Sequence, residues 1–570
     1  MAQFEIKDGV AIIPDGTTEF SYNTYRNCTS LKSITIPESV KTIAGHAFEG
    51  CTSLESIVVA DGNRVYDSRE GCNAIIETAT NTLIKGCKTT VIPNSVTEIG
   101  DWAFLDCTSL KSITIPESVT EIGRYAFEGC TSLENITIPE GVTEIGGYAF
   151  RGCTSLKSIT IPESVTKIGS CVFEGCTSLE SVTIPEGVTE IREGAFKGCA
   201  SLESIVVADG NSVYDSREGC NAIIETTTNT LIQGCKTTVI PESVTNIGYS
   251  AFRDCTSLES VTIPEGVTEI VSEAFYGCTS LKSITIPESV TEIGRYAFEG
   301  CTSLENITIP EGVTEIGECT FRGCTSLKSI TIPESVTEIG NWAFFGCTSL
   351  KSIIIPDSVT KIGGDAFKGC TSLESVTIPE GVTKIEVCTF EGCTSLKSII
   401  IPKSVKKIEE CTFSGCTSLE SVVIPKGVKK INERTFSGCS SLESVTIPKG
   451  VKKIIGRAFL DCTSLKSITI PESVTEIGYG AFFGCTSLES ITIPNSVTEI
   501  GDYAFGDCTS LESITISESV TKIGIGVVDG CTSLVTINVP AKKSHYCKWY
   551  LRPNVHDKIV ELAPEKKTKK

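Results

Sequence analysis

The residue types that most often do chemistry are rare in this chain, except for cysteine. It contains three histidines, His46, His545 and His556, and 29 cysteines. None of the histidines stands with a serine or cysteine and an acidic residue in the pattern that nucleophilic catalysis needs. The chain also lacks the His-Glu-x-x-His, Cys-x-x-Cys and Gly-x-x-x-x-Gly-Lys motifs of zinc and phosphate sites. We therefore expect no enzyme activity, no catalytic residue, no bound metal and no cofactor.

The cysteines are spaced too regularly to be independent sites. Cys107, Cys130 and Cys153 lie 23 residues apart, and from Cys28 to Cys531 the chain advances in 17 steps of 23 residues and two of 56. The repeated unit reads C-T-S-L-x-S-I-T-I-P-x-S/G-V-T-x-I-G-x-x-A-F-x-G. A period of this length indicates a solenoid, in which each repeat is one turn and neighbouring turns bury a shared core.

The repeat also predicts the structure of a turn. Ile113 and Ile115 alternate with polar residues as in a strand, and Pro116 ends that strand because proline has no N–H to donate. Such a short strand must pair with the same strand of the next turn. We expect a return through a short helical or 3-10 segment that carries Ala126 and Phe127. The predicted fold is an α/β solenoid, a curved stack of about 21 turns with short parallel strands.

The pattern resembles the BspA-like (Treponema-type) class of leucine-rich repeats, over roughly residues 4–540. The residues that carry the resemblance are Leu110, Ile113, Ile115, Pro116, Val119, Ile122, Ala126, Phe127 and Cys130. The resemblance implies a non-enzymatic interaction protein, and specifically a cell-surface adhesin that contacts host matrix proteins or other cells.

The two longer units, residues 51–106 and 199–254, each contain an insert. Residues 58–100 recur at 206–248 with only five differences. We expect each insert to form a hairpin that protrudes from the stack, with the first turning near Thr78–Asn81.

The ends of the chain depart from the repeat as caps do. Residues 1–27 are predicted to be a degenerate capping repeat, residues 28–540 the solenoid, and residues 541–570 a cap with a charged tail. In the first cap Phe20 and Tyr25 replace the usual isoleucine and phenylalanine. The residues suited to covering the last turn are Tyr546, Trp549, Tyr550 and Leu551.

A column of one cysteine per turn could bind metal, form disulfides or fill the core. Cysteine is among the most buried residue types, and one thiol per turn without clustered histidines gives poor zinc geometry. We therefore expect core filling. At the variable position two before the phenylalanine, the cysteines should lie nearer the surface, and two of them in adjacent turns could come close. The four cysteines are Cys171, Cys319, Cys388 and Cys411, of which Cys388 and Cys411 are the adjacent pair.

Three adjacent turns carry lysines where most turns carry glutamate or threonine after the proline. The nine residues, which we call the lysine patch, are Lys403, Lys406, Lys407, Lys426, Lys429, Lys430, Lys449, Lys452 and Lys453. Stacking should bring them within about two strand spacings, or ~10 Å. One interpretation is drift by recent duplication, with solvated lysines. The other is an anion-attracting site for an acidic protein or a polysaccharide.

Charge and hydropathy exclude some functions and leave three. A net charge of −21 disfavours nucleic-acid binding, and no apolar run is long enough to span a bilayer. We expect a monomer that binds a protein or polysaccharide, without nucleic acid or membrane insertion. The resemblance favours the cell surface, but no signal peptide or anchor motif is visible. The alternatives are an intracellular scaffold, which many unpaired cysteines favour, and an enzyme with a site in the inserts or cap.

Overall fold

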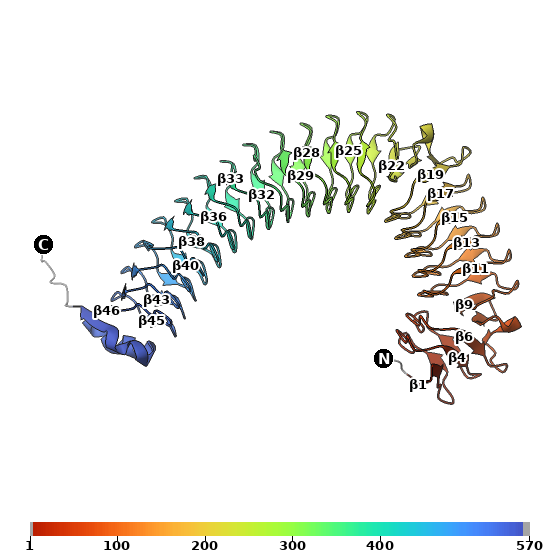
Figure 1. The fold of residues 1–570 in the computed structure, drawn as a ribbon, viewed down its shortest axis with the longest axis horizontal. Helices are drawn as coiled ribbons and strands as arrows, with labels where there is room; N and C mark the ends of the chain where they lie inside the picture. The colour runs from red at the N-terminus through yellow and green to blue at the C-terminus, as the bar shows by residue number, and fades with distance from the viewer. Residues whose placement is uncertain (1–3, 563–570) are drawn as a thin grey trace. The chain divides into compact units, whose positions relative to one another are not determined.

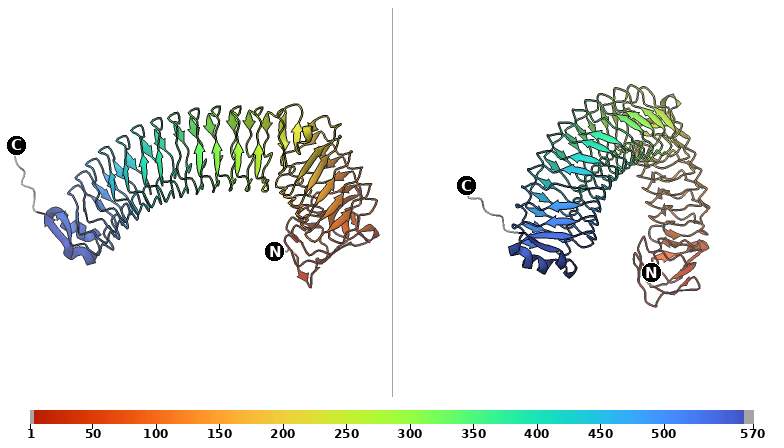
Figure 2. Two further views of the ribbon diagram at one scale, coloured as in Figure 1. Left: turned by 45° about the horizontal axis from the view of Figure 1, so that its top comes forward. Right: turned by 60° about the vertical axis from the view of Figure 1, so that its left-hand side comes forward.

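The computed structural model describes residues 4–562 and has two compact units. Unit 1 spans Met1–Leu281 and unit 2 spans Lys282–Lys570. The fold is a β-solenoid of about 24 turns, with parallel strands and almost no helix. Within each unit the turns lie side by side (Figures 1 and 2). The count exceeds the expected number because the two ends of the chain and the two inserts add strands to the stack.

Each regular turn contributes two short strands. In one turn they are β11 (Ser112–Thr114) and β12 (Glu121–Ile122), separated by a tight turn in which the Val119 N–H donates to the Pro116 oxygen at 3.0 Å. Both strands pair in parallel with the next turn, so that Ile113 faces Ile136 and Ile122 faces Ile145. Proline ends the first strand as predicted, while the second strand was not predicted.

We call the series of first strands in each unit its first ladder, although hydrogen bonds divide it into several short sheets. In unit 1 they are β4 (Ser33–Ile36), β6 (Ser56–Val59), β11, β13 (Asn135–Thr137), β15 (Ser158–Thr160), β17 (Ser181–Ile184), β19 (Ser204–Val207) and β24 (Ser260–Thr262). In unit 2 they are β26 (Ser283–Thr285), β28 (Asn306–Thr308), β30 (Ser329–Thr331), β33 (Ser375–Thr377), β35 (Ser398–Ile400), β37 (Ser421–Val423), β39 (Ser444–Thr446), β42 (Ser490–Thr492), β44 (Ser513–Thr515) and β46 (Thr536–Pro540).

We call the series of second strands in each unit its second ladder, which is likewise divided into several sheets. In unit 1 they are β3 (Glu19–Phe20), β5 (Thr42–Ile43), β10 (Glu98–Ile99), β12, β14 (Glu144–Ile145), β16 (Lys167–Ile168), β18 (Glu190–Ile191), β23 (Asn246–Ile247) and β25 (Glu269–Ile270). In unit 2 they are β27 (Glu292–Ile293), β29 (Glu315–Ile316), β31 (Glu338–Ile339), β32 (Lys361–Ile362), β34 (Lys384–Ile385), β36 (Lys407–Ile408), β38 (Lys430–Ile431), β40 (Lys453–Ile454), β41 (Glu476–Ile477), β43 (Glu499–Ile500) and β45 (Lys522–Ile523).

The return side of each turn is not helical, which corrects the expected helical or 3-10 segment. Tyr125 has φ of 58°, in the left-handed region that a right-handed helix cannot contain. The Phe127 N–H donates to Ala149 in the next turn at 2.7 Å, and not to its own turn. The return side is therefore a third inter-turn ladder. The described helical segments lie in the inserts and the carboxy-terminal region: η1 (Arg69–Gly71), η2 (Arg217–Gly219), η3 (Ala541–Lys543), α1 (Ser544–Tyr550) and η4 (Pro553–Lys558).

The core of each unit consists of columns of identical side chains. Phe104 stacks on Phe127 with ring centroids 5.0 Å apart, and Phe344 stacks on Phe367 at 5.3 Å. Each of these rings is fully buried, which contributes roughly 1.5–3 kcal/mol per side chain. A single turn has no partner for such a column, so stability comes from stacking.

The repeat cysteines fill the core as expected and also form hydrogen bonds. The Cys130 thiol is fully buried and lies 3.2 Å from the Phe104 carbonyl oxygen, to which it donates. The same bond joins Cys347 to Phe321 in unit 2. Burial raises the pKa of Cys347 to about 12, so its thiol stays protonated. Cys107 departs from the pattern and is only half-buried.

The inserts form hairpins but do not protrude as predicted. In the first insert β8 (Ala74–Glu77) pairs antiparallel with β9 (Thr82–Gly86), and β9 pairs in parallel with β10. This pairing makes the hairpin part of the second ladder of unit 1. Its side chains Ile75, Ile76 and Leu83 are fully buried, which holds the hairpin against the core. The remaining insert strands are β7 (Tyr66–Asp67), β20 (Tyr214–Asp215), β21 (Ile223–Glu225) and β22 (Thr230–Gln233).

The ends of the chain extend the first ladder. At the amino end β1 (Ile6–Lys7) pairs antiparallel with β2 (Val10–Ala11), which joins β4 in parallel. At the carboxy end β47 (Ile559–Leu562) pairs in parallel with β46. Phe20, Tyr25 and Leu551 are buried.

The predicted boundaries, 1–27, 28–540 and 541–570, stay predictions, and we propose that the two ends act as caps. The side chains of Tyr546, Trp549 and Tyr550, and the tail Glu565–Lys570, lie outside the described residues.

Candidate binding surface

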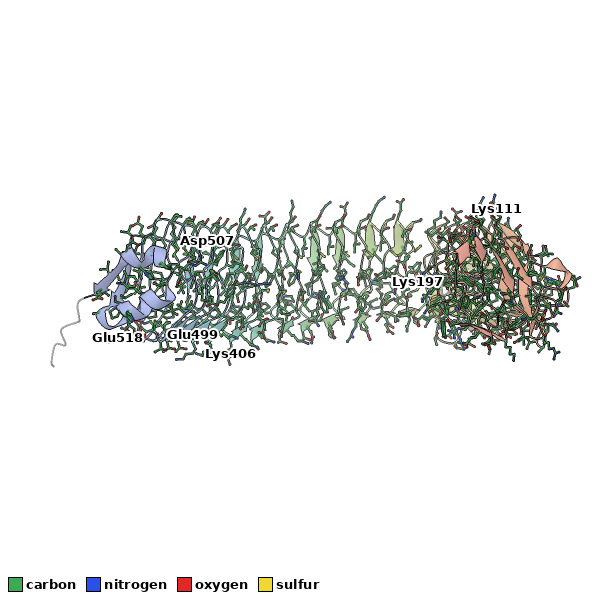
Figure 3. All side chains as sticks on the ribbon, turned by 90° about the horizontal axis from the view of Figure 1, so that it is seen from below. Lys111, Lys197, Lys406, Glu499, Asp507 and Glu518 are labelled. Atoms are coloured by element: carbon green, nitrogen blue, oxygen red, sulfur yellow. The ribbon has the colours of Figure 1, made fainter. Side chains whose placement is uncertain are left out.

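The lysine patch lies on the tight turns and second strands of three consecutive turns in unit 2. Pro402 follows β35, and the Val405 N–H donates to its oxygen at 3.2 Å, which closes the tight turn. Val405 and Ile408 are buried, so the intervening Lys406 and Lys407 point outward. Figure 3 shows Lys406 at the same edge of unit 2 as Glu499 and Glu518, with Asp507 at the opposite edge. The lysines of the patch thus replace glutamate or threonine on an edge that carries acidic residues in other turns.

The backbone brings the lysines of neighbouring turns together. The Lys452 N–H donates to the Lys429 oxygen at 2.8 Å, and Lys430 faces Lys453 in register on β38 and β40. Lys384, outside the patch, faces Lys407 in the same way. All nine patch lysines are exposed. The second and third turns of the lysine patch are therefore paired in register, and the patch as a binding site stays a prediction.

Few carboxylates neutralise the patch. Lys407 contacts Glu409 at 2.6 Å and Lys453 contacts Glu476 at 2.6 Å. Burial opposes ionisation of Glu409, but its hydrogen bonds to Lys384 and Lys407 hold its pKa below the usual range. In the part of the chain that the structure describes, the other seven lysines form no ion pair: Lys403, Lys406, Lys426, Lys429, Lys430, Lys449 and Lys452.

Exposed aliphatic side chains stand beside the patch. On the outer face of the first ladder most turns carry threonine, but Ile354, Ile400 and Val423 replace it and are 83%, 63% and 71% exposed. Ile400 and Val423 precede Lys403 and Lys426 by three residues, which is about 10 Å of extended chain. The surface therefore joins positive charge to exposed aliphatic side chains.

The sequence analysis missed an aromatic column on the return side of unit 1. His46 and Trp102 have ring centroids 4.6 Å apart, and Tyr125 and Tyr148 stack at 4.8 Å. His46 and Trp102 are 56 residues apart, and the first insert leaves their turns adjacent. Next to the column is a pocket of about 390 Å³ lined by Arg26, His46, Glu49, Trp102, Leu105, Asp106, Tyr125 and Glu128. The available signal was the aromatic residues that recur two before the phenylalanine.

The four cysteines at the variable position divide into two groups. Cys171, Cys388 and Cys411 are half-buried, as expected. Cys319 is only 3% exposed, so its predicted place near the surface is wrong. The larger residues Tyr296 and Trp342 occupy the same position in the turns before and after it.

A model of the BspA type leucine rich repeat region matches most of the chain. The matched residues are 10–72, 80–211, 230–351, 339–463 and 429–550. No curated protein matches the chain. None of the described helices combines the length and apolarity needed to cross a membrane.

Several solved structures are similar to this chain. A leucine rich cell surface protein from Faecalibacterium prausnitzii is 34% identical, with a TM-score of 0.44, over 63% of this chain and 82% of that one. A leucine-rich repeat protein from Bacteroides ovatus is 27% identical, with a TM-score of 0.39, over 87% and 98%. A leucine-rich repeat protein from T. pallidum is 39% identical, with a TM-score of 0.28, over 28% and 78%.

Proposed function

Because the chain belongs to the BspA-type leucine-rich repeat family, we propose that it is a non-enzymatic binding protein that captures an acidic segment of another protein on the lysine patch. Repeats of this family typically build binding proteins and not enzymes. The proposed contact surface consists of the nine lysines with Ile400 and Val423 beside them.

The observation that carries this proposal is the unpaired charge of the patch. Seven exposed lysines without an ion pair among the described residues stand close together in a chain of net charge −21. Like charges on adjacent strands oppose strand pairing by up to about 1 kcal/mol each. The protein is rich in carboxylates that could have neutralised these lysines. That the lysines stay unpaired despite the energetic cost supports a role in attracting an anionic ligand.

The aliphatic residues favour a protein ligand over a polysaccharide. An acidic polysaccharide satisfies the lysines but offers no aliphatic side chain to Ile400 and Val423. An extended acidic peptide can place carboxylates on Lys403 and Lys426 while its apolar residues cover the aliphatic pair. Burying those two side chains adds about 25 cal/mol per Å² of apolar surface removed from water.

We further propose that this binding serves adhesion at the cell surface, as the family resemblance suggests. Protease treatment of intact cells, with a known cytosolic protein as the protected control, tests the location. Release of peptides from the chain would support adhesion. Full protection until lysis would overturn it and favour the alternative, an intracellular scaffold. That alternative draws support from the 29 cysteines, since so many thiols suit a reducing compartment.

The ligand class is tested with three labelled probes at physiological salt. They are poly-glutamate, a copolymer of glutamate and leucine, and a sulfated polysaccharide. We expect the glutamate–leucine copolymer to bind most tightly in fluorescence anisotropy. Tightest binding of the polysaccharide would reassign the ligand to a glycan, and no binding of any probe would overturn the proposal.

A further inference from the structure

The return side of unit 2 brings one thiol and two carboxylates together, and a second thiol stands at the same position of the next turn. Asp365, Cys388 and Cys411 occupy the same position of successive turns, two before the phenylalanine. Three residues later in two of those turns stand Lys368 and Glu391. These side chains form a small array separate from the lysine patch.

The backbone fixes this array. The Asp365 N–H donates to the Val387 oxygen at 2.9 Å, and the Cys388 N–H donates to the Glu410 oxygen at 3.0 Å. Asp365, Cys388 and Cys411 all adopt the left-handed conformation, with φ between 52° and 55°. Because the three residues share one conformation in a ladder, their side chains leave the backbone in the same direction.

The potential ligand atoms converge. The carboxylate oxygens of Asp365 and Glu391 and the sulfur of Cys388 lie within 4.8 Å of one another, and all three residues are half-buried. The Lys368 ammonium already lies among them, 3.4 Å from Asp365 and 3.0 Å from Glu391. The array therefore gathers a cation on its carboxylate side while the Cys388 thiol faces the same space.

We propose that Asp365, Cys388, Glu391 and Cys411 bind one borderline-soft divalent cation of the Zn²⁺ class. Thiolate and carboxylate ligands suit Zn²⁺, which takes four of them in a tetrahedron at about 2.0–2.3 Å. Cys411 stands at the position of Cys388 in the next turn, outside the three residues whose ligand atoms lie within 4.8 Å of one another, and its thiol would have to move toward them to supply the fourth ligand. Binding releases the two thiol protons to solvent, and the Lys368 ammonium moves away as the cation takes its place.

The consequence for the fold is a clip across three turns. In a solenoid each turn contacts only its neighbours, so its stability depends on local interfaces. A cation held by residues 365, 388, 391 and 411 would join three turns at once. The site is independent of the proposed ligand of the lysine patch, and either proposal can fail without the other.

The same chain offers internal controls. Cys171 and Glu174 have the spacing of Cys388 and Glu391, but Arg151 and Lys197 contact the Glu174 carboxylate at 3.4 and 3.1 Å. Two cations and no second thiol surround that pair, so it offers no site for a divalent cation. Cys319 is buried between turns and is likewise a control.

Titration of the full chain with Co²⁺ and Zn²⁺ tests the proposal. We expect one Co²⁺ per chain with thiolate-to-cobalt charge-transfer absorption, which an equivalent of Zn²⁺ displaces. Replacing Cys388→Ser and Cys411→Ser should lower the affinity at least about 100-fold, beyond the usual cost of outer-shell changes. Cys171→Ser with Cys319→Ser should leave it unchanged.

A conservative pair of variants keeps the test valid if the double cysteine variant misfolds. Glu391→Gln should weaken Co²⁺ binding at least about tenfold, whereas Glu174→Gln should not. Absence of charge-transfer absorption in the wild type would overturn the proposal. So would absorption that survives Cys388→Ser with Cys411→Ser, or equal effects of Glu391→Gln and Glu174→Gln.

Discussion

Lys430 and Lys453 face each other in register on adjacent parallel strands, so two like charges stand one strand spacing apart. Lys453 has a carboxylate partner, Glu476 at 2.6 Å, while Lys430 forms no ion pair among the described residues. Elsewhere in the same ladder both kinds of pair occur: Glu338 faces Lys361, whereas Glu476 faces Glu499. Because like charges at cross-strand contact oppose pairing, we expect the Lys430–Lys453 pair to lower the stability of its turns.

We therefore expect the substitution Lys430→Glu to raise the free energy of unfolding and to weaken ligand binding. The substitution places a carboxylate opposite Lys453, and an opposite-charge pair replaces a like-charge one, which is worth about 0.5–1 kcal/mol. Urea unfolding of the variant measures this gain. As a matched control, Lys328→Glu removes the existing pair with Glu305 at 2.7 Å and should destabilise. A loss of stability in Lys430→Glu would show that the patch is not strained by its charges.

Glu409 should matter for stability only above acidic pH. Its carboxylate lies 2.9 Å from Lys384 and 2.6 Å from Lys407, which hold its pKa below the usual range despite burial. A lowered pKa gives stability that is present above the unfolded pKa, about 4.3, and is lost as pH falls through the folded value.

Glu409→Gln should therefore lower the free energy of unfolding by roughly 0.5–1 kcal/mol at pH 7 and have little effect at pH 3. Urea unfolding at the two pH values checks this. Glu380→Gln, at an exposed residue without an ion pair in the described structure, is the control. Equal losses at both pH values would mean that the carboxylate charge is not the cause.

The buried thiols should make the protein sensitive to alkali. Burial raises the pKa of Cys176 and Cys347 to about 12, whereas an unfolded thiol ionises near 8.5. A raised pKa gives stability that is fully present below the unfolded value and is lost as pH rises toward the folded value. For each such thiol, the free energy of unfolding falls by up to about 1.4 kcal/mol per pH unit above 8.5.

We expect the Tm from circular dichroism to fall between pH 8 and pH 9.5, before most tyrosines and lysines titrate. A variant with Cys324→Ala, Cys347→Ala and Cys370→Ala should show a shallower decline. A Tm independent of pH over this range would contradict the burial of the thiols.

The left-handed position of each turn should prefer glycine over a β-branched residue. Arg434 has φ of 52° and is exposed, with only a 4.0 Å contact to Glu433. Left-handed backbone costs a non-glycine residue about 1–2 kcal/mol. Arg434→Gly should stabilise by about 0.5 kcal/mol after its own entropy cost, and Arg434→Val should destabilise. Ser437→Gly, in the same turn at a position without positive φ, should destabilise, and a gain there would contradict the argument.

The repeat itself was predictable because its signals are local. Proline ends the first strand, and the alternation of Ile113 and Ile115 indicates a strand wherever it recurs. The return side was mispredicted because the Ala-Phe pair of each turn suits a helical segment. The residue just before that pair, such as Tyr125, adopts the left-handed conformation, which excludes a helix there. A signal was present: Gly194, Gly480 and Gly526 stand at the position of Tyr125 in other turns, with φ of 70°, 52° and 64°.

The candidate sites were predictable only where residues stack at a constant step. The lysine patch and the placement of Cys388 and Cys411 at the same position of adjacent turns follow from the 23-residue step. The pairing of Cys388 with Asp365 and Glu391 does not, because it depends on side chains at two different positions of two turns. The contact of His46 with Trp102 was also hidden, because the first insert separates them by 56 residues.

The central claim is that the lysine patch binds an acidic protein segment. The most direct measurement is the Kd of the glutamate–leucine copolymer, at low and physiological salt, for the wild type and two variants of equal net charge. The patch variant carries Lys403→Glu, Lys426→Glu, Lys430→Glu and Lys449→Glu. The control variant carries Lys157→Glu, Lys351→Glu, Lys397→Glu and Lys466→Glu, which are exposed lysines outside the patch.

We predict that the patch variant binds the copolymer at least about tenfold more weakly, which corresponds to a loss of about 1.4 kcal/mol of binding free energy shared by four reversed charges. Its binding should also lose most of its dependence on salt, because the screened attraction is gone. The control variant should stay within about twofold of the wild type. Equal weakening in both variants, or unchanged binding in the patch variant, would contradict the account.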